Sequence, residues 1–531
     1  MPPTMAAKVA VPDDAPSQGM RRELNLFGAV SMIVGIVIGS GIFLGVNRVA
    51  AGTGSPWLIV LVWLVAGFLT LMGALTYAEL GTIFPKAGGE YVFLKEGMGS
   101  FAAFLSGWTA FTINLAGSAA ALAVVFAEQL NQLKPEGFGR FVLMRLGPES
   151  DPWLQIDGIK ITAAALIGSL SIVNYFGVRF GGGVQMVFTA LKGGLIVMLA
   201  GAAMLFLGDA ASPRAGLFES VAVEGTPSAD GFTVAGFFGL AMVAALFAYD
   251  GWTNVVRVGA ELRNPSRNIP RAMLFGLAAI MVLYILVSFG YLNVLGFEGF
   301  ANGEAAGFQN DRTVASNAAE VLFGAGGENL VAVMILVSVF GALNGITLSG
   351  PRIYYAMSVD RLFPRLFGKL NRHRVPHQAI LYQALLAIVF LMFFDFNELS
   401  DNVVFISFFF YALTAIGLMV LRRTHPDLPR PYRVWGYPVV PVVFILTSLT
   451  FVGYLVWQQA AAVASGGFAI GDLNRLVGIL VVAAGIPVFL FYRRRLVREC
   501  EEKGLLPPAP MFGPDPYAEE READPGGGQD A

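Results

Sequence analysis

Apolar residues form long runs in this chain, and most polar residues are confined to the segments between the runs. A helix of about twenty apolar residues is long enough to cross the ~30 Å hydrocarbon core of a bilayer. An isolated strand would leave its backbone groups unsatisfied there, so we expect helices. The pattern therefore predicts an all-α integral membrane fold of about twelve transmembrane helices, near residues 26–50, 57–80, 101–127, 161–178, 184–208, 233–257, 271–296, 329–357, 377–396, 402–421, 438–458 and 474–492.

Composition supports a membrane protein and removes several kinds of site. The 531 residues are 56% hydrophobic and 14% charged, whereas soluble proteins contain about 25% charged residues. The formal net charge of -2 gives no attraction to nucleic acid, so membrane lipid is the expected environment. The single cysteine, Cys500, forms no intrachain disulfide, and the three histidines fall in hydrophilic linkers. No metal site and no cofactor are expected.

The distribution of Lys and Arg predicts the orientation. Most of the 35 Lys and Arg residues lie in the N-terminal segment, in every second loop and in the C-terminal segment. Cytoplasmic segments of membrane proteins carry an excess of these residues. We therefore expect a multi-pass protein of the cell (plasma or inner) membrane with both termini in the cytoplasm. Residues 1–21 and most of 496–531 are expected to be disordered, on either side of a membrane domain over residues 22–495.

Two predicted spans are interrupted near their middle. The first contains a glycine cluster over residues 35–41, and the sixth contains Asp250 and Gly251. Glycine costs a helix about 1 kcal/mol relative to alanine, although small residues also let membrane helices pack closely. Because the spans are five apart, we expect two five-helix halves of opposite topology, residues 26–208 and 233–421, followed by two helices within 438–492. Such paired interruptions indicate a transporter binding site.

The chemistry of the breaks indicates a substrate. Backbone N–H groups of Ser40, Gly41 and Ile42 would begin a half-helix, where the dipole favours a carboxylate. The carbonyl groups of Val37 and Phe247 would end half-helices and suit an ammonium group. An α-amino acid carries both groups and is therefore the expected substrate.

Several motifs resemble a known family. Residues 38–43 (Ile-Gly-Ser-Gly-Ile-Phe) and 77–80 (Tyr-Ala-Glu-Leu) closely resemble the amino acid–polyamine–organocation (APC) permeases. Residues 247–252 (Phe-Ala-Tyr-Asp-Gly-Trp) and 340–345 are similar to the L-type amino acid transporter (LAT) branch. The resemblance covers about residues 22–495. It implies a LeuT-like fold, with a 5+5 inverted repeat, discontinuous helices 1 and 6 and two extra helices, and it implies sodium-independent transport of amino acids, often by exchange.

The resemblance also implies site residues. Phe247 would cover the site from outside, whereas Asp250, Thr253 and Asn344 would face the substrate side chain. Many relatives have Asn where Thr253 stands. Eukaryotic members join an accessory glycoprotein through a cysteine in the third external region, but residues 128–160 contain none, so no disulfide-linked accessory subunit is expected. The expected substrate-binding residues are Val37, Ile38, Ser40, Gly41, Ile42, Phe247, Ala248, Tyr249, Asp250, Thr253 and Asn344.

Lys192 lies deep in the predicted fifth span. An unpaired ammonium at this depth costs at least ~2.5–3.5 kcal/mol, so the side chain is expected to have partners. A lysine at the matching place in sodium-independent family members stands where related symporters hold sodium. By this resemblance, Lys192 would bridge the first span near Gly35 to the eighth near Ser338, and with Phe247 these residues are expected to serve gating or coupling.

Asp250 leaves the substrate class open. Its carboxylate would bind a cationic side chain, or it would satisfy freed N–H groups or pair with Thr253. We favour the second reading, and hence an exchanger of small or medium neutral L-amino acids. A proton-coupled importer, an exchanger of basic amino acids or polyamines, and a membrane amino acid sensor remain alternatives. An enzyme is not expected, because no histidine lies within any predicted span.

The two longest predicted external connections are residues 128–160 and 297–328. The second contains a helix-like stretch from Thr313 to Phe323. It is expected to form either an outer cover over a transport pathway or a packed surface loop.

Overall fold

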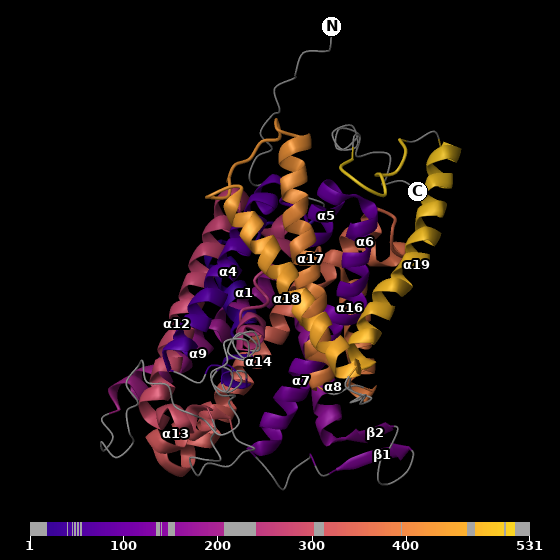
Figure 1. Ribbon diagram of the computed structural model, residues 1–531. Helices are drawn as coiled ribbons and strands as arrows, with labels where there is room; N and C mark the ends of the chain where they lie inside the picture. Colours follow the sequence, from indigo (N-terminus) through magenta and orange to yellow (C-terminus); the bar gives the residue numbers. More distant parts are fainter. Residues whose placement is uncertain are drawn as a thin grey trace.

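Long helices that run side by side make up most of the molecule (Figure 1). Eight of the described helices are long and apolar enough to cross a membrane, and Leu26–Val37 and His377–Phe393 are shorter apolar helices. The predicted all-α membrane fold is confirmed. The computed structural model describes residues 19–39, 41–44, 46, 49, 53, 56–133, 139, 141–146, 154–206, 241–301, 313–393, 396–464, 473–503 and 506–515.

The described helices follow the predicted spans in order. Residues 233–240 of the predicted sixth span lie outside the described residues, and residues 241–248 are helical. The first half contains α1 (Leu26–Val37), α2 (Gly41–Leu44), α4 (Pro56–Ile83), α6 (Ser100–Thr109), α7 (Leu115–Gln132), α8 (Gly158–Tyr175) and α9 (Val178–Leu205). The remainder contains α11 (Asn254–Arg257), α12 (Pro265–Ala301), α14 (Gly327–Ser349), α15 (Pro351–Val359), α16 (His377–Phe393), α17 (Phe396–Thr424), α18 (Val439–Ala464) and α19 (Leu473–Lys503).

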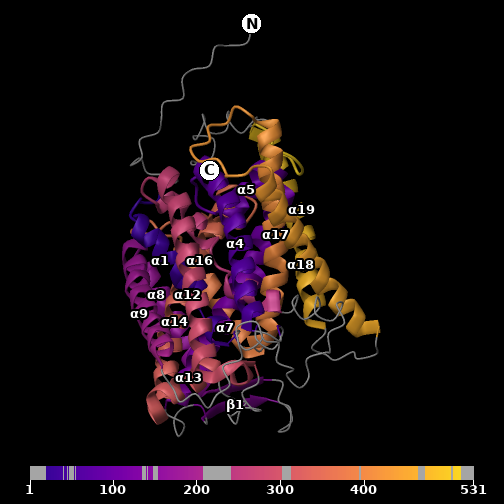
Figure 2. The ribbon, with the colours of Figure 1, turned by 60° about the vertical axis from the view of Figure 1, so that its left-hand side comes forward.

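The segment before α1 lies beside the connection between the sixth and seventh spans. The N–H group of Leu24, just before α1, donates to the Glu261 carbonyl at 3.0 Å, and the N–H group of Arg263 donates to the Leu24 carbonyl at 2.8 Å. Asn25 caps α1 by accepting a hydrogen bond from the Gly28 N–H group, which satisfies one of the unpaired donors of the first turn. From this start α1 packs against α9, α12 and α14 (Figure 2).

Of the elements that lie between the spans, one was predicted from the sequence and others were not. The helix expected at residues 313–323 is confirmed as α13 (Val314–Phe323), with Thr313 as its N-cap. The 128–160 connection contains an antiparallel hairpin of β1 (Val142–Leu146) and β2 (Leu154–Asp157), which was not predicted. Also not predicted is α5 (Glu90–Met98), which lies at the opposite end of the bundle from α13 and the hairpin (Figure 1).

The third span is not a uniform α-helix. Between α6 and α7, residues Ala110–Asn114 form one turn of π-helix, labelled η1. Single π-turns inside α-helices occur frequently at functional sites. A π-turn also changes the rotation of the residues that follow it relative to those before it. This turn sets the face that α7 presents to the centre of the bundle.

Candidate functional site

Both predicted helix breaks are present, and they face each other. α1 ends at Val37 and α2 begins at Gly41, while turn residues 249–253 separate the helical residues 241–248 from α11. A Cβ atom built on Gly41 would lie 2.9 Å from the Cα atom of Ala248. Gly251 has a φ of 110°, a left-handed conformation that glycine adopts without steric cost. The two breaks therefore touch, and glycine is required at this contact.

A cavity of about 100 Å³ lies at the two breaks. Residues of α7, Ile346 of α14 and Tyr411 of α17 also line the cavity. The residues contributed by the breaks are Ile36, Val37, Gly39, Gly41, Phe247, Ala248, Asp250, Gly251 and Thr253.

Most of the predicted substrate-binding residues reach this cavity. Val37, Gly41, Phe247, Ala248, Asp250 and Thr253 line it. Ile38 and Ile42 are buried but are not among the lining residues. The Tyr249 side chain points toward α4, where its hydroxyl donates to the Trp63 carbonyl at 3.1 Å. Ser40 lies outside the described residues.

Asn344 does not face the cavity, in contrast to the expectation. Its amide nitrogen donates to the Gly181 carbonyl at 3.0 Å and to Oε1 of Gln185 at 2.9 Å, and its amide oxygen accepts from Asn174. The cavity is lined instead by Ile346, two residues further along α14. Two residues correspond to about 200° of helix rotation, so Asn344 is directed to the opposite side. It joins α14 to α8 and α9.

Lys192 makes the predicted bridge behind the cavity. Its ammonium nitrogen lies 2.7 Å from each of three carbonyl oxygens, those of Gly35, Ile38 and Ser338. Only 1% of the residue is exposed. An ammonium group has three donors, and the three carbonyls use all of them. The Ser338 hydroxyl also donates to the Ile38 carbonyl at 2.7 Å, so the end of α1 is held from α9 and α14 together.

Asp250 faces the cavity and has a partner that was not predicted. The Tyr411 hydroxyl donates to Oδ1 of Asp250 at 2.8 Å. Thr253 lies 3.5 Å from the same hydroxyl, so it contacts Asp250 only through Tyr411. The two predicted ammonium acceptors also have partners. The Val37 carbonyl accepts from the Gly39 N–H group at 2.8 Å and from the Tyr284 hydroxyl at 3.2 Å, and the Phe247 carbonyl accepts from the N–H group of Asp250.

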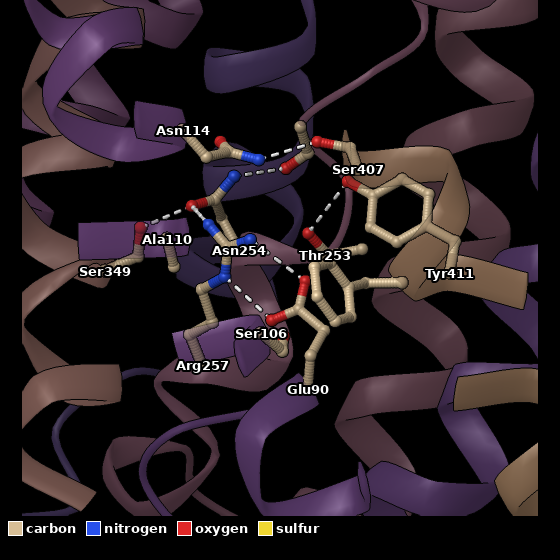
Figure 3. A network of polar contacts seen from close by, with 12 residues as sticks. Glu90, Ser106, Ala110, Asn114, Thr253, Asn254, Arg257, Ser349, Ser407 and Tyr411 are labelled. Carbon is tan, nitrogen blue, oxygen red and sulfur yellow. Dashed lines mark hydrogen bonds and ion pairs between the residues drawn. The ribbon is translucent and has the colours of Figure 1, made fainter. Parts of the chain in front are cut away.

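A network of buried polar contacts lies beside the cavity (Figure 3). The Arg257 guanidinium binds the Glu90 carboxylate through two contacts of 2.9 Å and donates to Oδ1 of Asn254 at 2.8 Å. Arg257 and Asn254 also line the cavity. On another side, the Asn114 amide donates to the Ser407 hydroxyl at 2.6 Å. The polar contacts thus connect residues at the cavity to α5 and α17, and on the side of the third span they involve the π-turn η1.

Twelve of the lining residues were not among the predicted substrate-binding residues, and they include the polar Asn114, Ser118 and Tyr411. Asn114 and Ser118 are four residues apart, so they share one helix face, and both line the cavity from the third span. This pair of polar residues in an apolar span was an available signal. Tyr411 stands among apolar and aromatic residues in α17, and nothing local distinguishes it from a packing residue.

Known proteins resemble this chain over most of its length. A family model described as amino acid permease matches residues 24–482. The serine/threonine exchanger SteT of Bacillus subtilis (strain 168) is 31% identical over 90% of this chain and 98% of that protein. The b(0,+)-type amino acid transporter 1 of Mus musculus is 31% identical over 81% of this chain and 82% of its own length. The large neutral amino acids transporter small subunit 2 of Homo sapiens is 29% identical over 88% and 80%.

A permease is a transport protein, so the prediction that the chain is not an enzyme is confirmed. The relatives are named as amino acid transporters or exchangers, which agrees with the predicted family. The chain belongs to the amino acid permease family, within the LAT-like branch of the APC superfamily that its motifs resemble.

Proposed function

We propose that this protein exchanges small or medium neutral L-amino acids across the cell membrane by alternating access and without sodium. The observation that carries the proposal is the cavity formed where the breaks of the first and sixth spans touch. Each break contributes residues with backbone groups outside regular helix to the cavity lining. This is the kind of surface that a zwitterion needs, because its two charges require hydrogen bonds once they leave water.

The carboxylate and the ammonium group of the substrate are assigned to different parts of the cavity. The carboxylate binds at the start of α2, where Gly41 lines the cavity, together with Ser40 and Ile42 as predicted. The ammonium group binds the Val37 and Phe247 carbonyls. A carbonyl oxygen has two lone pairs, so the Phe247 carbonyl, which accepts from the Asp250 N–H group, keeps capacity for a substrate hydrogen. At the Val37 carbonyl, the ammonium group would replace the Tyr284 or the Gly39 donor. Phe247, which also lines the cavity, is the proposed outer cover.

Sodium independence rests on Lys192. The ammonium group binds the Gly35, Ile38 and Ser338 carbonyls at 2.7 Å. Carbonyl oxygens gathered from the end of a broken helix are also the ligands that transporters use for Na⁺. A covalently attached cation in this position leaves no room for a mobile one, and Lys192 therefore takes the place of a coupling ion.

The names of two relatives support neutral amino acids as substrates, and one of these names also supports exchange. One is named a serine/threonine exchanger, and this chain covers 98% of its length. Another is named a transporter of large neutral amino acids. No disulfide-linked accessory subunit is proposed, because the single cysteine of the chain, Cys500, lies near the end of α19 and not in the 128–160 connection.

A second candidate is an exchanger of basic amino acids or polyamines. The observation in its favour is Asp250, whose carboxylate faces the cavity. Two observations favour a neutral substrate. Tyr411 already donates to the Asp250 carboxylate, and the cationic Arg257 lines the same cavity. A cationic side chain would have to compete with both.

Counterflow in proteoliposomes tests the proposal. Vesicles containing the purified protein are loaded with unlabelled serine, and uptake of labelled serine is measured with sodium, without sodium, and with an imposed pH gradient. We expect equal uptake with and without sodium, no uptake into vesicles that lack internal amino acid, and competition by alanine, serine and threonine. Uptake that requires sodium or a proton gradient contradicts the exchange mechanism, and competition mainly by arginine or polyamines contradicts the neutral class.

A further inference from the structure

The last helix carries a cationic groove that the proposed transport function does not use. α19 continues past its apolar part, and together with Arg365 of the short helix η5 (Arg365–Gly368) it encloses a cavity of about 750 Å³. Five cationic side chains line this cavity, against two acidic ones. We define the lysine–arginine groove by its five cationic residues, Arg365, Arg494, Arg495, Arg498 and Lys503.

The positive charge of the groove is not neutralised within the described part of the chain. Glu499 lies 3.0 Å from Arg365, 3.2 Å from Lys503 and 3.2 Å from Arg361, so three cations share its carboxylate. The exposed Arg494, Arg495 and Arg498 take part in no ion pair or side-chain hydrogen bond there. Three guanidinium groups in one groove therefore lack an anionic partner.

The other end of the groove is apolar. Pro487, Leu490 and Phe491 line it, and 63% of Phe491 is exposed. The exposed apolar surface continues along α19, where 65% of Leu480 is exposed. Figure 1 shows α19 at the edge of the bundle, where a span faces lipid. The groove therefore lies where the apolar span ends and the charged segment begins.

We propose that this groove binds the headgroup and upper acyl chain of an anionic phospholipid. The phosphate would contact Arg494, Arg495 and Arg498, and the acyl chain would lie along Leu490 and Phe491. Arginine binds phosphate oxygens through paired, charge-assisted hydrogen bonds. Basic pockets at the cytoplasmic ends of membrane helices are suited to anionic headgroups.

Membrane proteins generally carry an excess of positive charge on one side, and this explains why the groove segment contains many arginines. It does not explain why these arginines line one groove. The groove combines residues of α19 with Arg365, more than one hundred positions earlier, and it includes an apolar wall. A free phosphate ion would gain nothing from that wall. A phospholipid uses both parts, and it would join α19 to the segment that follows α15.

The test compares two variants with the same loss of charge. Arg494→Gln/Arg495→Gln/Arg498→Gln removes the groove arginines, and Arg267→Gln/Arg271→Gln/Arg423→Gln removes three other exposed arginines from the predicted cytoplasmic face. Full-length proteins are reconstituted in nanodiscs of phosphatidylcholine with increasing phosphatidylglycerol, and the lipid retained after detergent extraction is counted by native mass spectrometry. A parallel sample that contains phosphatidylglycerol also receives inorganic phosphate as a competitor.

We expect phosphatidylglycerol to be retained by the wild type and by the control variant. The groove variant should bind it on the order of 10- to 100-fold more weakly, since each cation near an anionic membrane contributes to binding. Equal retention by the groove variant, an equal loss in the control, or displacement of the lipid by inorganic phosphate would overturn the proposal. If the triple variant does not fold, Arg498→Gln alone is compared with Arg423→Gln, under the same criteria.

Discussion

The ammonium nitrogen of Lys192 lies 2.7 Å from the carbonyl oxygen of Ile38, the C-cap residue that follows α1. This carbonyl has no helical partner because the helix stops, and a side chain from α9 supplies the missing donor. The contact stabilises the break and neutralises the negative end of the α1 dipole. The Lys192 cation is therefore coupled to the cavity through the end of α1, although Ile38 itself does not line the cavity.

Replacement of the ammonium group tests this coupling. We expect Lys192→Ala to insert into the membrane and to exchange amino acids at least about 10-fold more slowly, because hydrogen bonds to a charged group contribute roughly 1.5–3 kcal/mol each. The measurement is counterflow, normalised to the amount of protein in the vesicles. Lys369→Ala, at an exposed position, should match the wild type. A stable Lys192→Ala protein with wild-type exchange would show that the bridge has no role in transport.

The contact between the two breaks predicts a strict requirement for glycine at position 41. A methyl group there would meet the Ala248 backbone at 2.9 Å, which forces the breaks apart. We expect Gly41→Ala to reduce exchange by at least about 10-fold, since overpacking costs roughly 1–3 kcal/mol. Gly193→Ala is the matched control: it lies in the α9 span with no atom within 4 Å of the added methyl group, and it should retain full exchange. Normal exchange by Gly41→Ala would mean that the breaks need not touch.

The sequence predicted those features that leave a local signal. Length and polarity located the spans, and clustered glycines located the breaks. The isolated charge of Lys192 indicated that it has partners, and the family resemblance named Gly35 and Ser338 among them. The face of a helix was harder to predict. Asn344 and Ile346 lie in a span that is buried on most sides, so hydrophobic periodicity does not distinguish the face that meets the cavity.

Contacts between segments that are far apart in the sequence could not be predicted either. Tyr411 meets Asp250 from 161 positions away, and a tyrosine in an aromatic stretch gives no sign of that partner. The β1–β2 hairpin has a similar explanation. Its strands are short and largely exposed, so they lack the alternation of buried and exposed residues that identifies a strand.

Tyr411 controls how the Asp250 carboxylate is presented to the substrate. In Tyr411→Phe the carboxylate loses its hydroxyl donor at 2.8 Å and becomes available to a cationic side chain. We expect the KM for serine to rise about 10-fold, in line with the loss of one charged hydrogen bond, and competition by arginine to increase. The measurement is counterflow with excess arginine, alanine or leucine. Phe408→Leu, a neighbouring aromatic that does not line the cavity, is the control. If arginine already displaces label far better than alanine in the wild type, the neutral assignment is wrong.

The Arg257–Glu90 pair is predicted to be a major stabilising contact between α11 and α5. Both side chains are only 5% exposed, and removal of one member of a buried pair costs about 3–5 kcal/mol, because the other charge remains buried. Glu90→Gln and Arg257→Gln should each lower the unfolding temperature in detergent, and the double variant should lose less than the sum. Lys503→Gln breaks an exposed pair with Glu499, which is expected to contribute ~0–1 kcal/mol. Strictly additive losses would show that the two groups act independently.

Residues 506–515 return from α19 to the start of α6. The N–H groups of Ser100 and Phe101 donate to the carbonyls of Pro510 and Met511 at 2.9 and 3.1 Å. These two donors belong to the first turn of α6, which has no helical acceptors for them. The C-terminal segment therefore caps a membrane helix, and its removal should weaken the junction between α5 and α6.

Two truncations separate this capping from a general effect of shortening the chain. A protein that ends after Lys503 loses the cap, and a protein that ends after Tyr517 keeps residues 506–515. We expect the first to be less stable by about 1–3 kcal/mol, the usual cost of leaving buried donors without acceptors, and the second to match the full-length chain. The measurement is the unfolding temperature in detergent, followed by intrinsic fluorescence. Equal unfolding temperatures for the two truncated proteins would show that the hydrogen bonds to Ser100 and Phe101 do not contribute, and that water replaces them without loss.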